Sequence, residues 1–152
     1  MKKFITIFLI LFMSAGCSNK EMKTINPDEI TFGMLKIHKD GTLVNNIRLI
    51  ENEKLLKEAI ETYNNAKFLL VEEGKNENQV SIDPIPTDGT LEEEFSASYF
   101  TINVESSGND YYIGYKGDNI FKVIASGDSF KNSPLEYFVE SKKLKEIIMD
   151  NE

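Results

Sequence analysis

The chain has 152 residues, a formal net charge of -8, one cysteine and one histidine. A surface this acidic repels nucleic acid and anionic lipid headgroups. The composition therefore disfavours both as partners. One cysteine excludes an internal disulfide, and one histidine leaves few residues for a metal cage or a catalytic triad. The length suits a single globular domain.

The N-terminal segment has the layout of an export signal. Lys2 and Lys3 precede an apolar core at 4–13, and small residues at 14–16 stand before Cys17. The core is about half of the roughly 20 residues that a helix needs to cross a bilayer. We therefore expect the segment to be inserted and cut.

Ser14-Ala15-Gly16-Cys17 resembles the lipobox of bacterial lipoproteins, although Ser14 stands where leucine is most usual. The resemblance implies removal of 1–16 and a diacylglyceryl group on the Cys17 thiol, with palmitate-type acyl chains. The sequence has no Gly-rich phosphate loop and no dinucleotide fingerprint, so we expect no cofactor. Two acyl chains anchor a protein stably, since each buried methylene contributes about 0.8 kcal/mol. The alternative, an ordinary secretory signal, would leave Cys17 as a lone thiol in an oxidising exterior.

The expected organisation is a signal peptide at 1–16, a lipidated cysteine with a flexible tether at 17–28, and one domain at 29–152. The nine residues 18–26 span at most about 30 Å. The resemblance places the domain on the outer face of the bacterial cytoplasmic membrane. The Lys-, Asn- and Ile-rich composition resembles proteins of low-GC Gram-positive bacteria.

The first half of the domain reads as a hairpin, a helix and a strand. Alternating apolar residues predict strands at 31–38 and 43–50, and Asp40-Gly41 between them favours a type I′ turn. Residues 51–64 repeat apolar side chains at helical spacing. That apolar stripe comprises Leu55, Leu56, Ala59, Ile60 and Tyr63. A short apolar run at 67–71 predicts a third strand.

The second half reads as a meander and a final helix. Alternation and Gly/Asn/Asp turns predict three antiparallel strands within 95–125, followed by a short strand at 135–139. Ser141 can cap a terminal helix with Leu144, Ile147 and Ile148 on its apolar stripe. The predicted class is α+β, an antiparallel sheet of about five to six strands with two helices packed on one face. In this order of elements the body resembles small uncharacterised lipoproteins of Gram-positive bacteria.

The irregular stretch 72–94 is rich in acidic residues, which are ligands that Ca²⁺ prefers. The candidate cation ligands are Asp83, Asp88, Glu92, Glu93 and Glu94. Their spacing does not fit an EF-hand, because Pro84 and Pro86 stand where that loop would place ligands. A solvated acidic loop is the alternative interpretation.

Four tyrosines at 99, 111, 112 and 115 lie in adjacent predicted strands, and alternation must send some of them away from the helices. Tyr111, Tyr112 and Tyr115 are the candidates for a partner or ligand surface. Cross-strand aromatic pairs that only stabilise the sheet are the alternative.

These patterns predict a non-enzymatic module that is tethered to the membrane by its lipid and binds an envelope protein or peptide. The second hypothesis is a small-ligand or cation sensor that uses the acidic 72–94 loop. An enzyme is the third, as a carboxylate-based hydrolase, because acid pairs have no sequence spacing of their own. His38 lacks a visible catalytic partner, and Gly127-Asp128-Ser129 reads as a turn.

Overall fold

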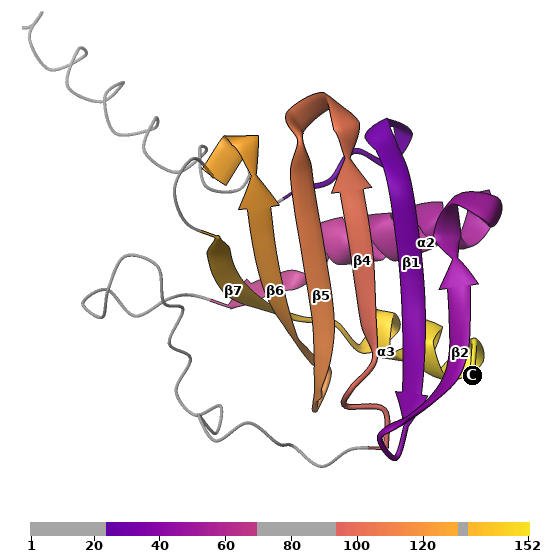
Figure 1. Cartoon of the computed structure of the whole chain (residues 1–152). Helices are drawn as coiled ribbons and strands as arrows, with labels where there is room; N and C mark the ends of the chain where they lie inside the picture. The colour runs from indigo at the N-terminus through magenta and orange to yellow at the C-terminus, as the bar shows by residue number, and fades with distance from the viewer. Residues whose placement is uncertain (1–23, 70–93, 131–133) are drawn as a thin grey trace, which may run out of the picture.

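The computed structural model describes residues 24–69, 94–130 and 134–152, which form one antiparallel sheet backed by two helices (Figure 1). Its strands are β1 Ile30–Lys39, β2 Thr42–Arg48, β3 Lys67–Leu69, β4 Tyr99–Val104, β5 Asn109–Gly117, β6 Ile120–Gly127 and β7 Leu135–Glu140. The helices are α2 Glu53–Asn64 and α3 Lys142–Asp150. The strand order β2-β1-β4-β5-β6-β7-β3 confirms the predicted α+β class. The sheet exceeds the five to six strands predicted, because the short runs at 67–69 and 135–140 both join it.

The hairpin turns form where the sequence places residues that tolerate positive φ. Asp40 and Gly41 have φ of 49° and 75°, which confirms the predicted turn between β1 and β2. Asp118 and Asn119 have φ of 48° and 65° between β5 and β6. Each turn joins two consecutive strands, so β1 pairs with β2 and β5 pairs with β6.

Both helices begin at side-chain caps. The Asn52 side chain accepts a hydrogen bond from the Leu55 backbone N–H at 3.2 Å, and Ser141 accepts from Leu144 at 3.2 Å, as predicted for Ser141. Helix α2 starts two residues later than predicted, because Leu49–Glu51 forms a 3-10 turn first. The predicted apolar stripes of both helices are buried against the sheet.

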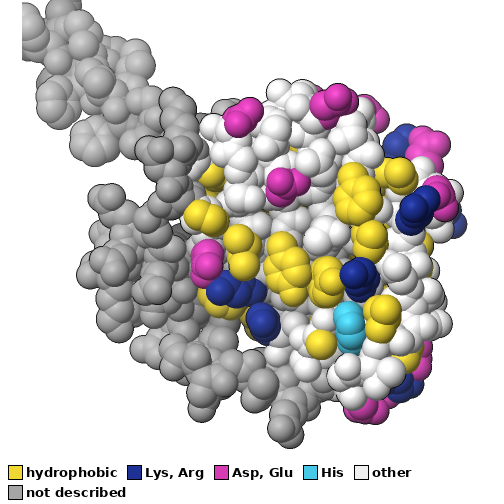
Figure 2. All heavy atoms as spheres, viewed as in Figure 1, with side chains coloured by type: hydrophobic (Ala, Val, Ile, Leu, Met, Phe, Trp, Pro, Cys, Tyr) yellow, Lys and Arg dark blue, Asp and Glu magenta, His cyan; other side chains and the backbone are white. Residues whose placement is uncertain are grey.

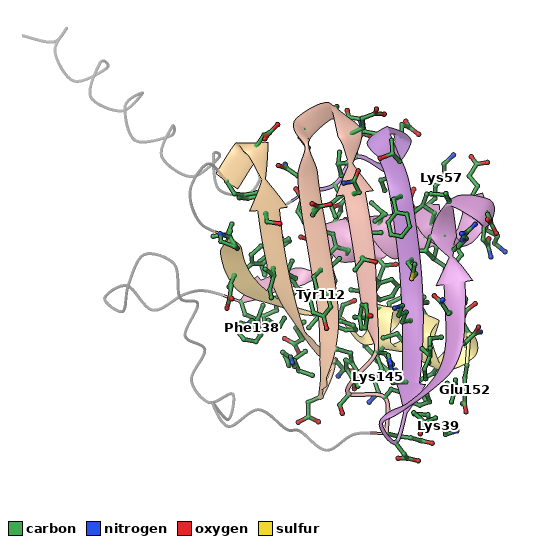
Figure 3. All side chains as sticks on the ribbon, in the orientation of Figure 1. Lys39, Lys57, Tyr112, Phe138, Lys145 and Glu152 are labelled. Atoms are coloured by element: carbon green, nitrogen blue, oxygen red, sulfur yellow. The ribbon has the colours of Figure 1, made fainter. Side chains whose placement is uncertain are left out.

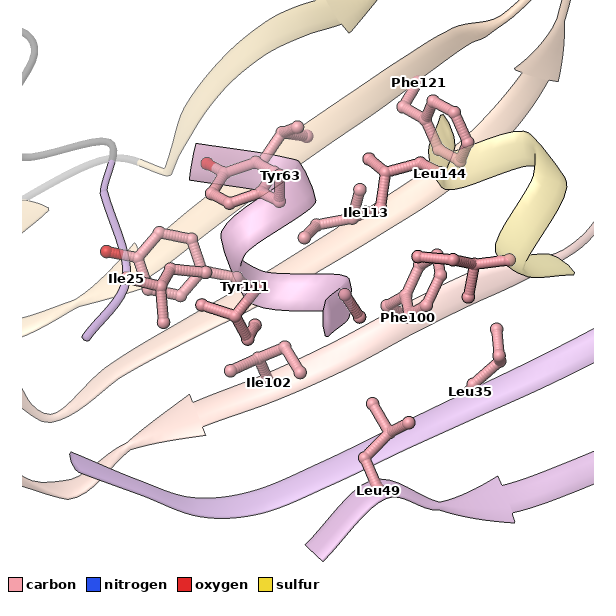
Figure 4. Close-up of a cluster of buried hydrophobic side chains, with 14 of the residues drawn as sticks. Ile25, Leu35, Leu49, Tyr63, Phe100, Ile102, Tyr111, Ile113, Phe121 and Leu144 are labelled. Atoms are coloured by element: carbon pink, nitrogen blue, oxygen red, sulfur yellow. The ribbon is translucent and has the colours of Figure 1, made fainter. Parts of the chain in front are cut away.

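The core fills the space between the sheet and the helices. Side chains that alternate along β1, β4, β5 and β6 point toward α2 and α3 (Figure 4). The largest buried side chains on these strands are Leu35, Ile37, Phe100, Ile102, Ile113, Tyr115 and Phe121. One face of the sheet is therefore closed by the helices.

The folded body begins earlier than predicted. Ile25 is 2% exposed; its backbone N–H donates to the Asn64 side chain at 2.9 Å, and the Asn64 amide donates back to its carbonyl at 2.7 Å. Pro27–Glu29 then forms a 3-10 turn. The prediction that the tether runs to residue 28 is therefore wrong, because residues 25–28 belong to the fold at the end of α2.

Two buried tyrosines make the core sensitive to alkaline pH. The Tyr63 and Tyr137 hydroxyls share a hydrogen bond, and burial raises the pKa of both side chains. The folded state keeps both hydroxyls protonated. Their contribution to the free energy of unfolding is therefore complete below the unfolded tyrosine pKa of about 10, and it is lost as the pH rises above that value. We expect the free energy of unfolding, measured with urea, to fall above that pH. In the double variant Tyr63→Phe/Tyr137→Phe the fall should be weaker, and an unchanged pH profile would contradict this assignment.

Gly127 is predicted to be essential to the end of β6. Its φ is 121°, and a Cβ there would lie 2.1 Å from the Gly108 carbonyl oxygen and 2.7 Å from the Asn109 Cα. Backbone atoms cannot yield as a side chain can, so Gly127→Ala should cost at least about 2 kcal/mol of unfolding free energy. Gly41→Ala is the matched control, because φ is 75° there but no atom lies within 4 Å, so only about 1 kcal/mol of strain is expected. If the urea midpoint shifted equally in both variants, the backbone around Gly127 would have moved to accommodate the Cβ, and the predicted clash would be contradicted.

Candidate functional site

The face of the sheet opposite the helices carries a continuous set of partly exposed apolar side chains. We call this set the open-face band; it comprises Phe32, Met34, Tyr99, Tyr112, Ile124 and Phe138. Figure 2 shows hydrophobic side chains crossing this face, with lysines and the histidine beside them. Contiguous apolar surface of this kind marks interaction sites more often than isolated exposed residues do.

Strand register explains why the band is continuous. Met34 pairs with Thr101, which pairs with Tyr112, and this row continues to Ile124 on β6. The adjacent row runs from Lys36 through Tyr99 and Gly114 to Lys122 and Phe138. Paired residues point to the same face, so five strands contribute neighbouring side chains.

An aromatic cluster occupies the centre of the band. The Tyr99 and Tyr112 ring centroids are 5.0 Å apart, and the His38 ring stacks on Tyr99 at 6.0 Å. The Lys36 Nζ lies 5.7 Å from the Tyr99 ring centroid, within the range of a cation–π interaction. Partial burial, with a smaller effect of Tyr99, raises the pKa of the Tyr112 hydroxyl, which keeps it a neutral hydrogen-bond donor further into the alkaline range.

Gly114 shapes this cluster. A Cβ at Gly114 would lie 2.7 Å from Cε1 of the Tyr112 ring and 3.0 Å from its hydroxyl oxygen. The ring therefore lies close against the β5 backbone, over the space that the glycine leaves. Figure 3 shows Tyr112 on β5 and Phe138 on β7, two strands away in the sheet.

Lysines line the band more than carboxylates do. Lys122 pairs with Glu136 at 2.7 Å, whereas Lys36 and Lys116 have no carboxylate within 4.0 Å among residues 24–69, 94–130 and 134–152. Asp110, beyond the aromatic cluster on β5, accepts a hydrogen bond from the Asn103 amide at 2.7 Å. An acidic protein thus presents uncompensated positive charge beside its aromatic cluster.

The structure divides the predicted tyrosines between the two faces. Tyr112 belongs to the open-face band, but Tyr111 and Tyr115 are 4% and 1% exposed and face the helices. The prediction of a partner surface is therefore wrong for Tyr111 and Tyr115, because alternation along β5 puts both residues on one face of the sheet and the helices pack on that face. Sequence reasoning did not assign Phe32, Met34 or Phe138 to the site. The sequence signal that could have identified them is their position in alternating strands, on the side opposite the buried residues.

The predicted cation ligands all come from the acidic stretch 72–94. Asp83, Asp88, Glu92 and Glu93 lie outside the described residues. Glu94 forms an ion pair with Lys39 at 3.0 Å, and the same ammonium contacts Glu152 (Figure 3). The hydrogen bond to Glu152 has the largest effect on the pKa of Lys39, followed by the hydrogen bond to Glu94, and both raise it. The part of the chain that the structure describes holds no group of three potential metal ligands.

Cys17 and the predicted signal peptide also lie outside the described residues. Neither α2 nor α3, nor any other helix within those residues, has the length and apolar character needed to span a bilayer. Comparisons with protein-family models, with curated proteins and with solved structures find no match.

Proposed function

We propose that the protein is a lipid-anchored, extracytoplasmic module that binds a protein or peptide partner through the open-face band. The observation that supports this most directly is the asymmetry of the sheet. One face is closed by α2 and α3, while the other carries a continuous apolar and aromatic surface. A partner that covers this surface would remove apolar area from water, which contributes about 25 cal/mol per Å².

The place where the chain enters the fold, at Ile25, suits a binding module that is tethered at its N-terminus. Ile25 is held at the Asn64 end of α2, within the helix-backed core (Figure 4). The open-face band lies on the opposite side of the sheet. The seven residues between Cys17 and Ile25 span at most about 25 Å, so the domain would stay close to the membrane. A lipid anchor on Cys17 would therefore leave the band free for membrane proteins or their peptide products.

The anchor has a direct test. Cys17→Ser removes the thiol that would carry the diacylglyceryl group, so the protein should move from the membrane fraction to the soluble exported fraction. Fractionation with immunodetection measures the change, and Ser14→Leu, which restores the usual lipobox residue, should stay membrane-bound. Membrane retention of the Cys17→Ser protein would contradict a lipid anchor.

The binding face can be tested by site-specific photo-cross-linking in intact cells. A photoreactive residue at Phe138 or Tyr99 should give a discrete adduct with a second protein, because both positions lie on the open-face band. The same residue at Lys54, on the exposed surface of α2, should give none. Adducts from Lys54 alone, or none from any open-face position, would overturn the proposed function.

A further inference from the structure

We infer that the partner element seated on the open-face band is an amphipathic α-helix whose apolar stripe is flanked by Asp and Glu. This inference rests on the proposed function and adds the conformation and charge of the partner segment. Three properties of the open face support it: its hydrogen bonding, its dimensions and its charge.

The hydrogen bonding of the sheet favours a helix. Strands β1, β4, β5, β6 and β7 each have a neighbour on both sides, so their backbone groups are used within the sheet. A segment laid across this face gains no main-chain partner from it, and a buried backbone without partners is costly. A helix satisfies its own N–H and C=O groups, whereas an extended peptide would need a free edge, at β2 or β3.

The dimensions of the band suit a helix of ordinary length. The band runs from β1 to β7, which are four strand spacings apart in the sheet. At about 4.8 Å per spacing the span is about 19 Å, and a helix rising 1.5 Å per residue covers it with about 13 residues. Helix α2, with 12 residues, already crosses the strands on the other face of the same sheet (Figure 1).

The charge beside the band favours acidic flanks. Lys36 and Lys116 have no carboxylate within 4.0 Å in the described ranges 24–69, 94–130 and 134–152, and Lys36 borders the aromatic cluster. By register, Lys36 and Lys116 both lie on the side of the band away from Asp110. Carboxylates on the flank of the apolar stripe that faces this side would meet these ammonium groups at the rim of the interface. A second copy of this chain fits less well, because a symmetric contact through the band would bring the same lysines together.

The test uses residues 17–152 with Cys17→Ser and three synthetic peptides of about 18 residues. The first has leucines at i, i+3, i+4 and i+7 with glutamates flanking them, the second has lysine in place of each glutamate, and the third is a scramble of the first. We expect the acidic helical peptide to bind at least about tenfold more tightly than the other two in calorimetry. Its binding should shift the amide resonances of Tyr99, Tyr112 and Ile124, and should weaken as salt rises.

Charge reversal supplies the matched variants. Lys36→Glu with Lys116→Glu changes two lysines beside the band that make no ion pair among the described residues, so the preference should invert toward the lysine peptide. Lys54→Glu with Lys143→Glu makes the same change in net charge on the exposed surfaces of α2 and α3 and should leave the preference unchanged.

Equal binding of the acidic and lysine peptides, no binding of the acidic peptide, or binding of the scramble as tightly as the helical sequence would overturn the inference. Resonance shifts confined to β2 or to β3 would overturn it in favour of an extended peptide at a sheet edge. Dilution-dependent shifts of the band without peptide would overturn it in favour of a second copy. If any of these occurs while Phe138 still cross-links to a protein, the proposed function stands and only the acidic helix fails. If cross-linking also gives nothing, both fail.

Discussion

Replacing Phe100 by alanine is expected to lower the free energy of unfolding by about 3–5 kcal/mol. Phe100 is 2% exposed and lies on β4, between Leu35 on β1 and Ile113 on β5 in the register of the sheet. Its ring fills the layer between the central strands and the helices, so truncation leaves a cavity that neighbouring strands cannot close. Urea unfolding followed by circular dichroism measures the loss.

Phe32→Ala is the matched control for this prediction. Phe32 lies on the neighbouring strand β1 but is 40% exposed on the open face, so the same truncation should cost about 1 kcal/mol or less. A loss at Phe32 as large as that at Phe100 would contradict the division of the sheet into a closed and an open face. It would mean that something in the free protein already covers the open-face band.

The second large effect is expected at Tyr111. Tyr111 is 4% exposed and packs edge-to-face against Phe130 at 6.3 Å, so Tyr111→Ala should cost about 3–5 kcal/mol of unfolding free energy. Tyr112→Ala, one residue along the chain, removes a partly exposed ring and one aromatic pair, and should cost about 1 kcal/mol. Thermal unfolding of the two variants under identical conditions measures the contrast.

The two tyrosines also separate stability from binding. If Tyr112 serves the proposed site, Tyr112→Ala should reduce cross-linking from Phe138 while the protein stays folded. A destabilisation at Tyr112 equal to that at Tyr111 would instead assign its ring to the sheet, and the surface role would fail for this residue. The comparison is informative because both residues are tyrosines and both lie on strand β5.

Interactions between residues close in the sequence were sufficient to predict the individual helices, strands and turns. Asn52 and Ser141 begin the two helices, the 55–63 stripe defines the buried side of α2, and Asp40-Gly41 closes the first hairpin. Each of these features depends on interactions within a few residues, so a sequence pattern can indicate it. The same patterns led to the α+β class and to the expectation that the helices share one face.

The sequence by itself therefore determined the elements, their turns and the buried sides of the helices, while the tertiary structure decided which strands are neighbours and which side of each strand is buried. Pairing of β1 with β4 and of β3 with β7 joins segments far apart in the chain, and only this register places Met34 and Tyr99 beside Tyr112. It also turns Tyr111 and Tyr115 inward and brings Ile25 to Asn64, which moved the start of the fold. Such contacts close long loops and are selected by packing of the whole core, so no local pattern of residues encodes them.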